Sequence, residues 1–263
     1  IGGTAGRTTL NGEGLQHQDG HSHLIASTIP NLKAYDPAYA YEVGVIVHDG
    51  LEKMYKQNQD IFYYITLENE NYVHPRMPKD IEDGIIRGMY QIKKTKKTKS
   101  KVQLLGSGPI LKEVIEASKL LNEDWGIESD VWSVTSYSEL HKDAEDINRW
   151  NLLNPNKENK ISYLNKCLNK SEGPIVACSD YVKLVSEQIS PYIDCDFTSI
   201  GTDGFGRSSS RDELRDFFEI DKFYITLAAV NTLYKQGKVD AKLVEKVINT
   251  YNIDSNKLNP LKC

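Results

Sequence analysis

Long hydrophobic runs and paired cysteines are both missing from this 263-residue sequence. No apolar stretch approaches the roughly 18–20 residues that cross a bilayer, and no signal peptide opens the chain, so we expect no membrane partner. Cysteines are few and have no CxxC spacing, and a chain of this length can fold without disulfides. Reduced thiols and a bacterial cytoplasmic location are therefore expected; the four cysteines are Cys167, Cys178, Cys195 and Cys263.

An excess of positive charge is also missing. The formal net charge is −5, which gives no reason to expect nucleic acid as a partner. The single basic run, Lys93–Lys101, is predicted to be a solvated hairpin or an inter-domain connector. The chain starts in a Gly/Thr-rich stretch without an initiator methionine, so we expect it to be a piece of a longer polypeptide.

Hydrophobic periodicity predicts alternating helices and strands in the first 90 residues. Residues 1–22 are predicted to form a loop because they are rich in glycine, threonine and histidine. Asp36 as N-cap and Pro37 at the first helical position predict a helix that runs to Lys56. The other predicted elements are a strand at His23–Pro30, a strand at Ile61–Leu67 and a helix at Ile81–Arg87.

The strand–helix rhythm continues over residues 101–240 and predicts a parallel or mostly parallel sheet. Helices are predicted from Pro109, within Tyr181–Ile189, from about Ser210, and over the two segments 221–237 and 240–253. Strands are predicted at Lys101–Gly106, Ser129–Tyr137, Pro174–Asp180 and Asp196–Ile200.

The richest candidate site is the stretch GLQHQDGHSH, which holds half of the six histidines. Three interpretations stay open: a metal site, a structural loop, and imidazoles that face a substrate. His21 and His23 have the HxH spacing of some metallohydrolases, but the downstream histidines lack further ligands beside them. In the third interpretation Asp19 fixes a histidine tautomer and Gly20 lets the backbone approach a ligand.

Two glycine-rich turns are weaker candidates. The turn Gly106–Gly108 lies between a strand and a helix and could cradle a phosphate, but tight turns of this kind use glycine anyway. The turn Gly201–Arg211 could bind an anion through Arg207 and Arg211. We favour the alternative that Asp203 and arginine hydrogen bonds to loop carbonyls hold this turn.

Several blocks together carry a family resemblance. The blocks GRTTLNGEGLQHQDGHSH, DPAYAYEVGVIVHDGLEKMY, KVQLLGSG and GTDGFGRSSSRDELRDFFEID occur in order between Gly3 and about Pro260. They resemble the C-terminal third of the homodimeric decarboxylating components of bacterial pyruvate dehydrogenase complexes, which are transketolase-like thiamine diphosphate enzymes. The resemblance implies an α/β chain. Residues 1–97 would be the second half of a pyrimidine-binding domain, and residues 98–263 a transketolase-type C-terminal domain with a mostly parallel sheet.

The resemblance also implies an activity and partners. Enzymes of this family decarboxylate pyruvate on thiamine diphosphate with Mg²⁺ and pass the two-carbon unit to the lipoyl group of the acetyltransferase. The implied partners are the remainder of the same enzyme, a homodimer partner and the dihydrolipoyl acetyltransferase core. Transketolases carry a similar motif, DGPTH, and the matching histidine here is His23. This match makes His23 the first catalytic candidate and His21 the second, with Asp19, Gly20 and His17 supporting the loop.

Part of the family's machinery is absent from the sequence. No GDG…N segment for magnesium and diphosphate occurs, and the glutamate that activates the aminopyrimidine is expected upstream of Ile1. We therefore expect the segment to be incomplete for catalysis on its own. The alternatives are a metal-dependent hydrolase that uses His21 and His23, or a non-catalytic, partner-binding remnant of the same fold.

Overall fold

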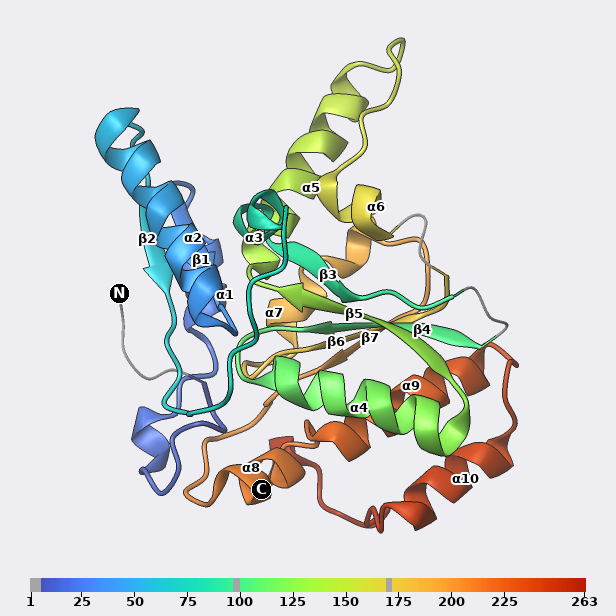
Figure 1. The fold of residues 1–263 in the computed structure, drawn as a ribbon. Helices are drawn as coiled ribbons and strands as arrows, with labels where there is room; N and C mark the ends of the chain where they lie inside the picture. Colours follow the sequence, from blue (N-terminus) through green and yellow to red (C-terminus); the bar gives the residue numbers. More distant parts are fainter. Residues whose placement is uncertain (1–5, 97–99, 169–171) are drawn as a thin grey trace.

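Two sheets of different size organise the computed structural model, which describes residues 6–96, 100–168 and 172–263 (Figure 1). The smaller sheet pairs strands β1 and β2 in parallel. The elements of this first part are η1 (Leu15–His17), α1 (Ser22–Ser27), β1 (Leu32–Tyr35), α2 (Ala40–Leu51), the π-helical turn η2 (Glu52–Lys56), β2 (Phe62–Ile65) and α3 (Glu82–Arg87).

The larger sheet has five strands in the order β3-β5-β4-β6-β7. All neighbours are parallel except β3, which runs antiparallel to β5, so the expected mostly parallel sheet is confirmed. Its elements are β3 (Met89–Lys93), β4 (Lys101–Gly106), α4 (Ile110–Trp125), β5 (Glu128–Val134), α5 (Tyr137–Leu153), α6 (Tyr163–Leu168), β6 (Ile175–Cys178), α7 (Leu184–Glu187), η3 (Ser190–Tyr192), β7 (Phe197–Ile200), α8 (Arg211–Phe217), α9 (Lys222–Lys235), α10 (Ala241–Thr250) and η4 (Pro260–Lys262).

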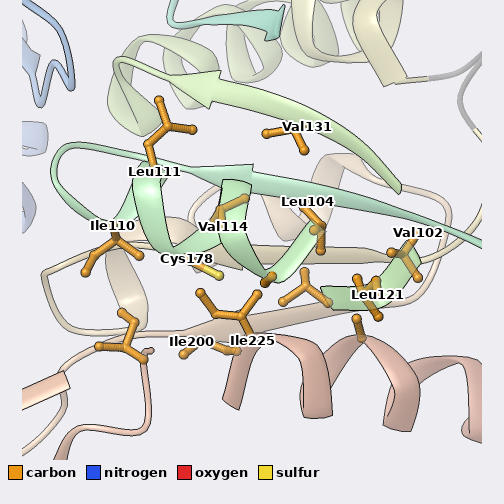
Figure 2. Close-up of a cluster of buried hydrophobic side chains, with 14 of the residues drawn as sticks. Val102, Leu104, Ile110, Leu111, Val114, Leu121, Val131, Cys178, Ile200 and Ile225 are labelled. Carbon is orange, nitrogen blue, oxygen red and sulfur yellow. The ribbon is translucent and has the colours of Figure 1, made fainter. Parts of the chain in front are cut away.

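Helices cover both faces of the larger sheet (Figure 1). On one face α4, α9 and α10 enclose a core that includes Leu104, Val114 and Ile225 (Figure 2). On the other face α5, α6 and α7 pack over Leu105 and its neighbours. Because successive strand residues point to opposite faces, β4 supplies apolar side chains to both cores.

The four cysteines lie in separate parts of the fold. All four cysteines are free thiols, and Cys178 lies in the core between the sheet and α4. Among the helices of the described residues, none has the length and the apolar character needed to cross a membrane.

Two predictions about local structure near the His-rich stretch are wrong. The segment predicted as a strand, His23–Pro30, instead holds most of the helix α1 (Ser22–Ser27) and the turn after it. Asp19 accepts hydrogen bonds from two backbone amides at the start of this helix, which stabilises it. Asp36 is not the cap of the next helix, which begins at Ala40. Glu42 instead closes that helix start by accepting from the backbone N–H of Tyr39 at 3.0 Å.

The basic run Lys93–Lys101 does not form the hairpin that was one of its two predicted structures. The strands that flank it, β3 and β4, are not paired, because β5 lies between them. The run is therefore not a hairpin; its residues 97–99 lie outside the described residues. Lys101 is buried and forms an ion pair with Asp130 at 2.9 Å. Since β3 already belongs to the larger sheet, that sheet begins before the predicted boundary at residues 97 and 98.

Candidate active site

His23 is the one histidine of the GLQHQDGHSH stretch whose side chain is buried, with 5% of its surface exposed. Helix α1 presents its imidazole to the ends of strands from both sheets. The ring makes edge contacts with Tyr181 at 4.6 Å and Tyr64 at 5.5 Å between centroids. Its Nε2 atom lies 3.2 Å from the hydroxyl of Thr66, the first residue after β2. The ring is thus held on three sides by other elements.

Burial determines the charge of this imidazole. Desolvation lowers the pKa of His23 to about 4, and the opposing attraction of Asp19 is smaller. The ring is therefore neutral at pH 7 and can donate one hydrogen bond and accept another. A general base works best when its pKa is near the operating pH, so this environment favours a hydrogen-bonding and orienting role for His23.

A small cavity lies beside the ring. It has a volume of about 10 Å³, which is room for about one water molecule. A cavity of this size does not hold an organic substrate. The lining residues are His23, Asp36, Ser107, Val134, Ser136, Tyr137, Ser138, Val185 and Gln188.

The Asp19 carboxylate hydrogen-bonds to the loop and to the start of α1, and not to the His23 ring. Its carboxylate accepts from the backbone N–H groups of His21 and Ser22, at 2.9 and 3.0 Å, and from the Ser22 hydroxyl. This arrangement is an N-terminal cap that fixes the start of α1. The hydrogen-bond partner of the His23 ring is the Thr66 hydroxyl, so the expectation that Asp19 fixes the tautomer is wrong.

Gly20 makes room for an arginine. A Cβ atom at this position would overlap the guanidinium of Arg7, which is 3% exposed. Arg7 donates to the carbonyl of Gly204. Burial lowers the pKa of its guanidinium, and the charges of three nearby aspartates oppose this effect only in part. Gly20 itself accepts from Val182 N at 3.1 Å. The glycine therefore allows close approach of a side chain of the same molecule, where the sequence suggested a ligand.

The other two histidines lie at the surface. His17 is in η1 and His21 is the N-cap of α1, and both side chains are exposed. Within residues 6–96, 100–168 and 172–263, no three side chains of histidine, cysteine, aspartate or glutamate are grouped so that they could hold a metal ion. The alternative of a metal-dependent hydrolase on His21 and His23 has no ligand set in that part of the chain.

Three acidic side chains converge behind His23. Asp180 accepts from the backbone N–H groups of Arg7 and Thr8 and from the Thr8 hydroxyl, at 2.7–3.1 Å. Burial raises the pKa of Asp36 to about 7 and that of Asp180 to about 6, and the charge of Asp180 adds to the effect on Asp36. Burial and the same two carboxylates raise the pKa of Glu68 well above its usual value. The sequence analysis did not identify this cluster.

The Gly106–Gly108 turn is filled by one of these acids. Ser107 donates its hydroxyl hydrogen to Asp36 at 2.8 Å, and Gly108 N donates to Asp36 O at 3.1 Å. At Gly108, with φ of +48°, a Cβ would lie 2.6 Å from the Asp36 carboxylate. This turn follows β4, whose two neighbours in the sheet are β5 and β6. The strand order changes direction between β4 and β6, and α/β sheets usually bind ligands in the crevice at such a point. A carboxylate of the chain itself occupies it, so the phosphate alternative is wrong.

The turn Gly201–Arg211 is held as the favoured alternative predicted. Arg211 donates from Nε to Thr9 O at 3.0 Å and from a terminal nitrogen to Asn69 O at 2.5 Å. Asp203 accepts from Lys183 N at 3.1 Å. Arg207 lies over an aromatic ring, and its backbone N–H binds the Gln18 side chain. The turn therefore braces the His-rich loop from outside.

Comparisons with known proteins agree with this architecture. The family model described as pyruvate dehydrogenase E1 component middle domain matches residues 1–75. The model described as transketolase-like TK C-terminal domain matches residues 88–221, half of the chain. The chain belongs to the transketolase-like C-terminal domain family.

Relatives of this transketolase-like chain are longer proteins. It is 55% identical over 265 residues to a protein of Pseudomonas aeruginosa named pyruvate dehydrogenase E1 component, and the match covers 100% of this chain and 30% of the relative. The chain thus spans about 30% of the length of the relatives that it matches.

Solved structures show the transketolase-like fold. A mutant transketolase of Pichia stipitis aligns over 90% of this chain and 31% of its own, with a TM-score of 0.65 and 17% identity. A split-gene transketolase, described as an inactive β4 tetramer, aligns over 88% of this chain and 65% of its own, with a TM-score of 0.56 and 16% identity.

The residues that sequence reasoning missed share a recognisable position. Asp36 follows β1, Thr66 follows β2, Ser107 follows β4, and Asp180 lies two residues after β6. The carboxyl ends of parallel strands meet at one edge of a sheet, where α/β proteins usually bind ligands. Polar residues directly after predicted strands were the signal that could have identified them.

Proposed function

We propose that this chain supplies the imidazole-bearing wall of the active site in a thiamine diphosphate-dependent pyruvate dehydrogenase of the E1 type. The observation that carries the proposal is the position of His23. It is the single buried histidine of the loop, and it meets hydroxyl and carboxylate groups at the ends of strands from both sheets. The relatives are named pyruvate dehydrogenase E1 component, and the family resemblance implies the reaction, the decarboxylation of pyruvate and transfer of the two-carbon unit to a lipoyl group.

The two sequence segments have separate roles in this proposal. Residues 1–97 act as part of a pyrimidine-binding domain, and residues 98–263 act as the transketolase-type C-terminal domain. The expected partners are the remainder of the enzyme, a second copy of it and the dihydrolipoyl acetyltransferase core, in the bacterial cytoplasm. The resemblance and the relatives' names support these assignments.

The described residues do not fit the cofactor's diphosphate and Mg²⁺. They hold no group of three or more acidic, histidine or cysteine side chains suited to a cation. Asp36 fills the first glycine-rich turn, and Arg211 in the second is committed to backbone carbonyls. We therefore assign the cofactor to other polypeptide of the enzyme and derive no step through it. The split-gene transketolase, whose matching chain is described as inactive, is a precedent for such a division.

The chemistry of His23 itself follows from its surroundings. A neutral imidazole beside the reacting centre donates a hydrogen bond to, or accepts one from, a substrate oxygen, and the tyrosine rings at Tyr64 and Tyr181 shield it from water. Such a fixed group orients the substrate without having to change charge. A positioned group of this kind contributes on the order of 10²–10⁴-fold to the rate.

A chimera tests the proposal. The matched 30% of the Pseudomonas aeruginosa relative is replaced by this chain, and pyruvate-dependent CO₂ release is measured with thiamine diphosphate and Mg²⁺. We expect an active chimera, and a loss of on the order of 10²–10⁴-fold in kcat/KM for H23Q. The matched control is H48Q, on α2, which the proposal leaves outside the site. The 263-residue chain by itself should release no CO₂.

Two results would contradict the proposal. If the chimera folds and H23Q retains full activity, His23 has no catalytic use and the non-catalytic alternative gains support. If the chain alone turns over pyruvate, it is complete, and the assignment of the cofactor to other polypeptide is wrong. Calorimetric titration of the chain with thiamine diphosphate and Mg²⁺ checks that second point without an activity assay.

A further inference from the structure

A line of polar groups runs inward from the His23 ring. The ring's Nε2 atom is 3.2 Å from Thr66 Oγ1, and that hydroxyl is 2.7 Å from Asp36 Oδ1. The other oxygen of Asp36 accepts from the Ser107 hydroxyl at 2.8 Å. Each of these side chains is buried, with 5% or less of its surface exposed.

The direction of the hydrogen bonds follows from the number of hydrogens available. A threonine hydroxyl donates once and accepts through two lone pairs, and an ionised carboxylate only accepts. Thr66 has two acceptors in reach, Asp36 Oδ1 at 2.7 Å and Tyr35 O at 3.3 Å. The shorter, charge-assisted bond to Asp36 takes the hydrogen. The Thr66 oxygen therefore presents a lone pair to His23, and Nε2 must be the donor.

We propose that Thr66 and Asp36 are positioning residues that hold His23 as the neutral tautomer with its proton on Nε2. The Nδ1 atom, which has no hydrogen-bond partner within the described residues, is then the nitrogen that accepts a hydrogen bond or a proton. The tautomer is a property of this chain; only its use in catalysis rests on the proposed function.

The surroundings keep the ring neutral and fixed in plane. Burial lowers the pKa of His23 to about 4, so a tautomer, and not a cation, is the form present at pH 7. The edge contacts with Tyr64 and Tyr181 restrict rotation of the ring. With the ring plane and the Thr66 hydrogen both fixed, one nitrogen carries the proton.

Nitrogen NMR on the full 263-residue chain reads the tautomer directly. A two-bond ¹H–¹⁵N correlation spectrum of ¹⁵N-labelled protein is recorded at pH 8, above the pKa of about 7 that burial gives Asp36. We expect a single neutral form of His23 with the proton on Nε2. In T66V, which keeps the shape and removes the hydroxyl, the ratio of the two tautomers should fall by about tenfold. T66S should restore the wild-type pattern.

A matched control separates positioning from general disturbance. Thr232 is also buried, and its hydroxyl donates to Ala228 O at 2.7 Å on α9, away from the ring. T232V should leave the His23 signals unchanged, with circular dichroism as the check of folding for both variants. A wild-type spectrum with the proton on Nδ1, or a folded T66V with an unchanged ratio, overturns the inference. The wild-type spectrum is decisive even if T66V fails to fold.

The chimera distinguishes this inference from the proposed function. An active H23Q chimera removes the catalytic proposal and leaves the tautomer result standing. An inactive H23Q chimera together with an Nδ1-protonated ring removes the positioning inference alone. If both hold, T66V should lower kcat and change its pH profile, and T66S should recover both.

Discussion

The pH dependence of stability gives a direct measure of the environment of His23. Its folded pKa of about 4 lies below its ordinary value of 6.5. Between these values the unfolded chain binds a proton that the folded chain does not, so stability rises with pH over this window. The contribution is complete above about pH 6.5 and is lost as the pH falls towards 4. The difference of about 2.5 pKa units corresponds to about 3 kcal/mol.

Urea unfolding of wild type and H23Q between pH 4.5 and 8 tests this reasoning. The wild type should gain stability relative to H23Q as the pH rises to 6.5, by up to about 3 kcal/mol, and the difference should then be constant. H21Q is the matched control on the same loop: the His21 side chain is exposed, so this variant makes the same substitution outside the buried site. A constant difference for H23Q would show that the folded ring titrates as it does in the unfolded chain. The burial argument would then be refuted.

Three further outcomes follow from the buried groups. D36N removes a carboxyl group whose pKa burial raises to about 7. The stability of wild type relative to D36N should therefore fall as the pH rises from about 4 to 7 in the same urea experiment. A rise in this difference would contradict the assignment. K101M leaves Asp130 buried without its partner and should cost about 3–5 kcal/mol, with partial recovery in the double variant K101M/D130N, measured by thermal unfolding. L104A opens a cavity under α4 and should cost about 2–5 kcal/mol, whereas L152A on the exposed end of α5 should cost less than about 0.5 kcal/mol.

The sequence predicts the larger sheet well because its strands and helices have strong, separate periodicities. The strand over Lys101–Gly106 is buried on both faces, as a central parallel strand requires, and its apolar residues Val102, Leu104 and Leu105 made it recognisable. The capping box at Ser210 and Glu213 marks the start of α8 at the predicted residue. Among the missed elements, the strands β1 and β3 have only 4 and 5 residues. The helix α5 has 17 residues and a cap at Ser136, which accepts from Glu139 N, so its start signal was present in the sequence and was overlooked.

The candidate site is harder to read from the sequence because its groups come from distant segments. His23 was found through its motif, but Thr66 and Asp36 contact it only after β1 and β2 pair and bring their carboxyl ends together. Asp36 had a plausible local role, since an aspartate before a proline is typical of a helix start. Tertiary contacts with Ser107 overrode that local preference.

Contacts at the crevice of the larger sheet join the two parts of the chain. The carboxyl ends of β4 and β6 form the crevice where α/β sheets usually take a ligand, and here they receive Asp36 and the backbone of Arg7 instead. A free ligand cannot occupy that crevice while these side chains remain. In the function proposed above, the binding surface would lie at the residues that cover this crevice. Among the residues that line the cavity, His23 is the titratable side chain from the His-rich loop. Substitutions that weaken the seat of Asp36, such as S107A, should thus disturb the His23 ring through Thr66, although Ser107 forms no hydrogen bond with it.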